Sequence, residues 1–136
     1  MTKLVSVEFA RLWTKLTKDW KLHLEEELSP LTEGQLNVLE LLLRHQPMKP
    51  SDLLAYLATT PAAITTLLDR MEKGGLVVRS RDENDRRIVW VTVTAKGESE
   101  MKRGVEIRDA YISQALDRIS SHNQQLLVYL LGKVAN

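Results

Sequence analysis

The chain has 136 residues, 19 basic and 18 acidic side chains, a formal net charge of +1 and no cysteine. This length suits one domain with a sizeable core, and the lack of cysteine excludes a thiolate nucleophile, a thiol redox sensor and a zinc site built on sulfur. No apolar run approaches the roughly 18 residues of a membrane span and no leader-like segment opens the chain, so we expect a soluble, cytoplasmic protein without a membrane partner.

The N-terminal segment, from Ser6 to about Leu28, predicts one long amphipathic helix, because its large apolar residues recur at spacings of three and four. These residues are Phe9, Leu12, Trp13, Leu16, Trp20 and Leu24. Pro30 ends the pattern. Thr32 and Gln35 then have the spacing of a capping box, which predicts a second helix that stops before Pro47.

The next segment predicts a helix-turn-helix. Pro50 suits the first turn of a short third helix that includes Leu53, Leu54 and Leu57, while Thr60 and Pro61 are suited to start a fourth helix. The Gly74-Gly75 pair would end that fourth helix. Its expected buried face comprises Ile64, Leu67, Leu68 and Met71. Its expected outward face comprises Ala62, Thr65, Thr66, Asp69 and Arg70.

Residues 76–93 predict a β-hairpin with a cationic tip, because the charged run 79–87 separates the apolar run 76–78 from the alternating run 88–93. From Arg70 to Lys96 there are seven basic and four acidic residues, whereas residues 1–46 hold six basic and seven acidic ones. The hairpin is therefore the cationic pole of the chain. A helix-turn-helix followed by a cationic hairpin is typical of a winged helix-turn-helix, which binds double-stranded DNA.

Two further helices are expected after the hairpin. Thr94 opens a long one that reaches about Ile119 in spite of Gly104. Ser120 or Ser121 caps the last one, with Gln124 at capping-box spacing. The predicted fold is mainly α with a small β-hairpin wing, in which residues 32–97 form the winged helix-turn-helix. Residues 1–31 and 98–136 form flanking dimerisation helices, whose apolar faces would cover one another in the monomer or, as we expect, pair in a homodimer.

Candidate DNA contacts lie on the fourth helix and on the hairpin. Small side chains at Ala62, Thr65 and Thr66 would let the helix approach base edges in the major groove. Arg70 would reach a guanine or a phosphate, and Thr60, at the positive end of the helix dipole, would lie near a phosphate. The alternative is that Thr60 merely caps the helix and Arg70 is a solvated charge.

In the hairpin we expect Arg87 to enter a narrow minor groove and Asp85 to orient it, because a carboxylate can hold a guanidinium in an extended pose. Three more arginines would meet phosphates, namely Arg79, Arg81 and Arg86. The alternative is a solvated turn with weak exposed ion pairs.

Three runs together resemble the MarR family of bacterial transcriptional regulators: Leu67-Leu68-Asp69-Arg70-Met71-Glu72-Lys73-Gly74-Gly75-Leu76-Val77, Arg81-Asp82-Glu83-Asn84-Asp85-Arg86-Arg87 and Val91-Thr92-Val93-Thr94-Ala95-Lys96-Gly97. The resemblance implies an obligate homodimer that binds pseudo-palindromic operators, usually as a repressor. It also implies release by a small phenolic or anionic ligand bound between the dimerisation helices and the DNA-reading module. Sensing of oxidants, which some members perform with a cysteine, is excluded here.

Four aromatic or amphipathic side chains are candidates to line a pocket for a small aromatic or anionic effector, with ordinary core packing as the alternative. They are Trp13, Trp20, His23 and Tyr111. The three histidines are scattered, so we expect neither a metal site nor a cofactor.

The chain has no constellation of catalytic residues, which argues against an enzyme. The remaining rival is a winged helix that docks on a protein without specific DNA binding. Threonine, alanine and arginine at the exposed tip suit phosphates and bases better than a protein partner.

Overall fold

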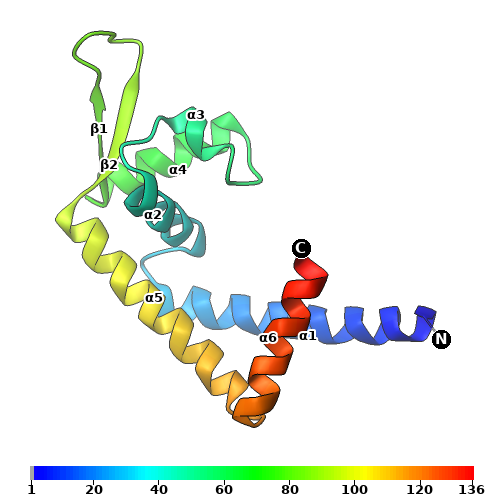
Figure 1. Ribbon diagram of the computed structural model, residues 1–136. Coiled ribbons are helices and arrows are strands. Elements are labelled where there is room, and N and C mark those ends of the chain that lie inside the picture. Colours follow the sequence, from blue (N-terminus) through cyan, green and yellow to red (C-terminus); the bar gives the residue numbers. More distant parts are fainter. Residues whose placement is uncertain (1) are drawn as a thin grey trace.

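The structure, a computed structural model, describes residues 2–136, and most of them are helical (Figure 1). In chain order the elements are α1 (Thr2–Leu28), α2 (Glu33–His45), α3 (Pro50–Leu53), α4 (Pro61–Lys73), β1 (Val77–Arg81), β2 (Val89–Val93), α5 (Ala95–Leu116) and α6 (Ser121–Ala135). The two strands form one antiparallel hairpin. The predicted fold class, mainly α with a β-hairpin wing, is therefore confirmed.

The hairpin and the free ends of α1 and α6 lie in different parts of the molecule (Figure 1). The hairpin extends beyond the group formed by α2, α3 and α4, while α5 leads away from it and α6 turns back from the far end of α5. Within residues 2–136, no helix is both long and apolar enough to cross a membrane.

The helix starts follow the predicted caps. The Gln35 amide donates to Thr32 Oγ1 at 3.1 Å and the Thr32 amide donates to Gln35 Oε1 at 3.2 Å, which completes the capping box of α2. Three boundaries differ from the prediction. Helix α5 ends at Leu116, three residues before the predicted Ile119. Helix α1 begins at Thr2, because nothing in the first residues interrupts the helical pattern. Helix α3 ends at Leu53, after which the Ala55 amide bonds the Asp52 carbonyl three residues back, so the chain tightens into turns before it reaches Thr60.

The core is centred on α2. Four of its residues, Leu36, Val38, Leu39 and Leu42, are at most 1% exposed. Around them lie buried residues from the end of α1, from α3 and α4, and from both strands. Those residues include Leu24, Leu28, Leu53, Ile64, Leu68, Met71, Val77 and Val91. Each fully buried Leu, Ile, Val or Met side chain contributes roughly 1.5–3 kcal/mol.

Helix α5 approaches this core through two glycines. A Cβ at Gly104 would lie 2.8 Å from Leu36 Cδ1, and a Cβ at Gly97 would lie 2.1 Å from the Leu76 carbonyl oxygen. Neither distance can accommodate a methyl group without movement of the neighbours. The glycine that interrupts the helical pattern at position 104 is thus the residue that allows α5 to pack on α2.

Charged side chains add polar links between α5 and the other helices. Arg108 donates to both carboxylate oxygens of Glu40 on α2, at 2.6 and 3.1 Å. Arg103 donates to the Leu28 carbonyl at the end of α1, at 2.7 Å. These bonds tie α5 to α1 and α2 at half-buried positions, where an arginine fork is a strong donor.

The start of helix α6 differs from the prediction in its hydrogen bonds. No residue of α6 is buried. Ser120 is the cap and accepts from the Asn123 amide, but the predicted capping box with Gln124 is wrong. Gln124 Nε2 instead donates to the carbonyls of Leu116 and Ile119, because the end of α5 brings those free carbonyls within reach.

Large apolar side chains are exposed along α6 and along the first half of α1. On α1 they are Leu4, Val5, Val7, Phe9, Leu12, Trp13 and Leu16. On α6 they are Leu126, Leu127, Val128, Tyr129, Leu130, Leu131 and Val134.

Replacing Gly97 with Ala is expected to destabilise the protein by about 1–3 kcal/mol, because the added methyl would overlap the Leu76 carbonyl, which is backbone and cannot rotate away. Urea unfolding at equal protein concentrations would measure the change. Gly34→Ala is the matched control, since its Cβ would meet Thr32 Oγ1 only at 4.0 Å. Equal stabilities for the two variants would contradict the close packing of α5 on the hairpin base.

Candidate nucleic-acid interface

The start of α4 presents the predicted small residues. Thr60 is the N-cap and accepts from the Ala63 amide at 3.2 Å, with Pro61 in the first turn. Ile64, Leu68 and Met71 are buried, whereas Leu67 is only half-buried. The exposed residues match the predicted outward face: Ala62, Thr65, Thr66, Asp69 and Arg70.

The two threonine hydroxyls of this face are already engaged as donors. Thr65 Oγ1 donates to the Pro61 carbonyl and Thr66 Oγ1 donates to the Ala62 carbonyl, both at 3.1 Å. A hydroxyl has one hydrogen and two lone pairs, so each threonine offers its lone pairs and its methyl group outward. This face of α4 therefore presents hydrogen-bond acceptors and small apolar groups.

Arg70 lies apart from these residues, in the last turn of α4 and about 12 Å further along the helix axis than Ala62. It borders a small cavity of about 230 Å³ together with Lys96 of α5 and Pro30 of the α1–α2 loop. The structure thus brings Ala62, Thr65 and Thr66 together and leaves Arg70 nearer to α5.

The wing is a regular hairpin up to its charged tip. Val77 pairs with Val93 at the base and Arg81 pairs with Val89 at the last rung. Beyond Arg81 the Asp82 amide donates to the Ile88 carbonyl at 2.9 Å, and the Ile88 amide donates to the Asp85 carbonyl at 3.0 Å. The tip is therefore an ordered turn rather than an open loop.

Asp85 holds Arg87 by two parallel hydrogen bonds at the tip. Arg87 Nε and Nη2 donate to the two oxygens of Asp85, each at 3.0 Å, and the Arg87 amide adds a third bond at 3.1 Å. The Arg87 side chain is 91% exposed. The Arg87 hydrogen bonds lower the pKa of Asp85 below its usual range, so Asp85 is ionised at neutral pH.

The three arginines expected at phosphates differ in their surroundings. Arg86 is exposed. Arg81 Nη1 donates to the Arg86 carbonyl at 2.7 Å, which places this side chain along the turn.

Arg79 binds two carboxylates of α4, Asp69 at 2.6 Å and Glu72 at 2.9 Å, and its side chain is only 26% exposed. Its backbone amide also donates to Glu72, at 3.1 Å. These bonds fasten the wing to the predicted reading helix. The sequence interpretation missed this pairing. The signal for it was that Asp69 and Glu72, three residues apart, share one face of α4.

The residues predicted to line an effector pocket fall into two places in the structure. Tyr111 of α5 contacts Trp20 edge to face at 5.7 Å between ring centroids and lies 4.5 Å from the His23 ring. Trp20 Nε1 also donates to Glu33 at 2.9 Å. Trp13 belongs elsewhere and stacks on Phe9 among the exposed apolar residues of α1.

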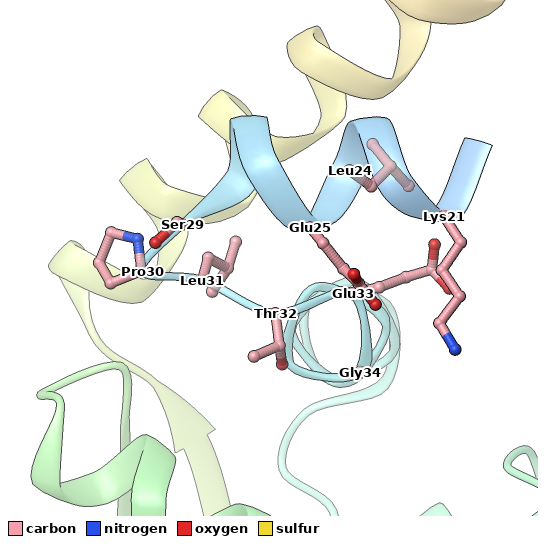
Figure 2. Close-up of a pocket in the computed structure, with 9 residues that line it drawn as sticks. All are labelled: Lys21, Leu24, Glu25, Ser29, Pro30, Leu31, Thr32, Glu33 and Gly34. Carbon is pink, nitrogen blue, oxygen red and sulfur yellow. The ribbon is translucent and has the colours of Figure 1, made fainter. Parts of the chain in front are cut away.

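A cavity of about 360 Å³ does lie where α1 meets α2 (Figure 2). It is lined by Lys21, Leu24, Glu25, Ser29, Pro30, Leu31, Thr32, Glu33 and Gly34. Among residues 2–136 there is no group of three histidine, aspartate or glutamate side chains arranged to hold a metal ion.

Comparison with known proteins identifies relatives over almost the whole chain. The transcriptional regulator HosA of Escherichia coli O157:H7 is 30% identical over 129 residues, which are 95% of this chain and 93% of HosA. The HTH-type transcriptional repressor MdtR of Bacillus subtilis is 26% identical over 109 residues, which are 80% of this chain and 70% of MdtR.

Solved structures agree with the sequence relatives. A MarR family protein from Bacillus stearothermophilus aligns with a TM-score of 0.85 and 26% identity, over 99% of this chain and 96% of that one. The C80S mutant of E. coli MarR complexed with operator DNA aligns with a TM-score of 0.76 and 28% identity, over 96% and 95%. The sequence profile described as MarR family matches residues 31–89. The chain therefore belongs to the MarR family and is a DNA-binding transcriptional regulator with a winged helix-turn-helix fold.

Proposed function

We propose that this regulator binds a pseudo-palindromic operator as a homodimer and represses transcription by occupying it. The observation that carries the proposal is the separation of two parts of the molecule: α4 with the hairpin, and the free ends of α1 and α6 (Figure 1). The first part exposes small polar residues and Arg87, and the second exposes large apolar residues. The operator complex of E. coli MarR supports the DNA target, and the relative named as a repressor, MdtR, supports the sign of regulation.

In this proposal the start of α4 reads the major groove. Thr65 and Thr66 direct lone pairs outward, so they would accept from the amino groups of adenine or cytosine, and their methyl groups with Ala62 would contact thymine methyls. Thr60 lies at the helix N-terminus, where the dipole favours a phosphate. Arg70, further along the helix, is better placed for a phosphate than for the same bases.

The hairpin would read the minor groove through Arg87. Asp85 keeps the guanidinium extended into solvent, and a narrow A·T-rich groove has the negative potential that attracts it. Arg86 would contact a flanking phosphate. Arg79 and Arg81 would meet phosphates only after releasing part of the bonds they make within the protein.

The apolar residues of α1 and α6 supply the argument for a homodimer. Seven large side chains on the first half of α1 and seven on α6 are at least 40% exposed in the single chain. Large apolar side chains exposed in this number on two helices favour an interface with a partner. A two-fold pairing through it would present two copies of α4 to successive major grooves about 34 Å apart.

We further propose that a small flat aromatic or anionic ligand releases the protein from DNA by binding where α1 meets α2. The cavity there has the volume of a small-molecule site and is lined by the apolar side chains of Leu24 and Leu31, by one cation, Lys21, and by two carboxylates, Glu25 and Glu33 (Figure 2). A ligand in it would contact both a dimerisation helix and the helix on which the reading module is built. A bound ligand would therefore change the distance between the α4 helices of the two subunits.

Arg87→Ala is expected to weaken operator binding by about 10- to 1000-fold, because each dimer loses two groove arginines worth about 1–2 kcal/mol apiece. Titration of an operator selected from random duplexes, across several salt concentrations, measures both the affinity and its salt slope. Arg86→Ala is the neighbouring control and should mainly reduce the salt slope, by about 0.9 for each phosphate that the variant no longer neutralises.

Base substitution in the DNA sharpens this test. Exchanging A·T pairs for G·C pairs under the wing should weaken the wild type and leave Arg87→Ala nearly unaffected. An Arg87→Ala variant that binds the operator as tightly as the wild type would overturn the minor-groove assignment. Failure of the wild type to select any duplex would instead favour docking on a protein.

The wild-type protein is expected to have twice the mass of one chain by light scattering, and a Leu12→Glu/Leu127→Glu variant is expected to be monomeric. Two charges on the exposed apolar surfaces would have to be buried without partners in a dimer. Lys18→Glu, an exposed change on α1, serves as the control. A wild type that remains monomeric at micromolar concentration would refute the dimer.

A further inference from the structure

Trp90 occupies an unusual place in the wing. It lies in β2 between Val89 and Val91, of which Val91 is fully buried against the core. Successive side chains of a strand point to opposite faces, so the Trp90 ring lies on the face of the hairpin away from Val91. It is half-buried there, outside the buried core cluster. A large ring in that position calls for an explanation other than core packing.

The polar edge of this ring is bonded to the wing tip. Trp90 Nε1 donates to Asp82 Oδ1 at 3.0 Å. Asp82 Oδ2 accepts from the amides of Asn84 and Asp85, at 3.0 and 2.9 Å. The two oxygens of Asp82 therefore have different tasks: one receives the indole and the other orders the backbone of the turn.

The turn that Asp82 orders is the one that carries the groove arginine. The amide of Asp85 is fixed by Asp82, and the carboxylate of Asp85 grips the Arg87 guanidinium in the two-bond fork. The hydrogen bond from Trp90 and, to a smaller extent, those from the turn amides lower the pKa of Asp82. Asp82 is therefore ionised at neutral pH and can accept all three bonds. An unbroken chain of hydrogen bonds and covalent bonds thus runs from Trp90 through Asp82 and Asp85 to Arg87.

We propose that Trp90 is a positioning residue for DNA binding: acting through Asp82, it holds the tip of the wing so that Arg87 is preset for the minor groove. The inference rests on the groove-reading role proposed for Arg87. Without the indole, Asp82 Oδ1 has no bond to hold it and only the two turn amides fix the carboxylate. The tip of the wing would then sample other conformations before it binds DNA. Affinity falls when a binding group must be ordered at the moment of association.

Trp90→Phe tests the proposal because it keeps an aromatic ring and removes the N–H donor. Its operator affinity is expected to be about 3- to 20-fold below that of the wild type, with an unchanged unfolding midpoint in urea. Trp20→Phe is the matched control, since it also deletes an indole bond to a carboxylate, here Glu33 of α2. Because Trp20 lies beside the proposed effector cavity, this control is compared by its unfolding midpoint and by the resonances of the wing, and not by its operator affinity.

A double-mutant cycle with Arg87→Ala decides between positioning and direct contact. If Trp90 acts through Arg87, Trp90→Phe has no effect on affinity in the Arg87→Ala background. An equal loss in both backgrounds would mean that Trp90 contributes by another route, and the inference would be wrong. The inference also fails if Trp90→Phe binds the operator as tightly as the wild type while Arg87→Ala binds it weakly. If Arg87→Ala itself binds normally, it is the proposed function of the wing that fails.

Asp82→Asn supplies a second variant with an independent prediction. Asparagine offers one acceptor oxygen, which can serve the indole or the turn amides but not both. Its affinity is expected to fall at least as far as that of Trp90→Phe, and adding Trp90→Phe to it should cost little more. In the free proteins, NMR resonances of the Arg87 Nε–H group should broaden or shift in both variants and stay unchanged in Trp20→Phe. Unchanged resonances in all three would contradict the relay.

Discussion

The burial of α2 is the constraint on which the rest of the molecule depends. Its four buried side chains share one core with the end of α1 and the inner face of the hairpin, and Leu36 packs on Gly104 in the middle of α5. The chain that leaves α2 is also bonded to the wing, because Met48 exchanges two backbone hydrogen bonds with Val91 and Gln46 accepts from the Val93 amide. The helices proposed to dimerise and the hairpin proposed to read DNA are therefore supported by the same helix.

Charge adds to apolar packing in setting the relation between α4 and the wing, because Leu68 and Met71 of α4 already share the buried core with Val77 of β1. Arg79 of β1 bonds two carboxylates of α4, at 2.6 and 2.9 Å, and its side chain is 26% exposed while those of Asp69 and Glu72 are 51% and 40% exposed. An arginine fork between two acids resists rotation better than a single contact. The helix and the hairpin are thus held at one angle before they meet a partner, and little conformational freedom remains to be lost on binding.

Much of the fold could be predicted from the sequence because its signals are local. Thr32, Thr60 and Thr94 each cap a helix by accepting from an amide three residues later, and that spacing is visible in the sequence. The hairpin was predictable from alternation on both sides of a charged turn. The end of α3 was not, because the residues that follow it, Leu54, Ala55, Tyr56 and Leu57, include no stop signal. The turns after Leu53 depend on how the chain reaches Thr60.

The finer parts of the site depend on pairings that only the folded chain reveals. Gln124 has the spacing of a capping box, yet its side-chain amide donates to the Leu116 and Ile119 carbonyls at the end of α5. Arg79 finds its acids seven and ten residues upstream, across a helix end and a glycine turn. Trp90 lies opposite Ser80 in the hairpin register, and Asp82 is two residues beyond Ser80 on the same face. This register brings the indole within reach of Asp82. In each case the residue type indicated a polar contact, but the sequence did not indicate which residue would be its partner.

The three tryptophans are distributed so that each one occupies a different working part of the molecule. Trp13 is 53% exposed on the apolar half of α1, Trp20 is bonded to Glu33 where α1 meets α2, and Trp90 lies in the wing. Indole emission shifts to shorter wavelength as its surroundings lose water. Variants that retain one tryptophan each would therefore give optical signals for subunit pairing, for events beside the cavity and for DNA contact, all without an attached dye.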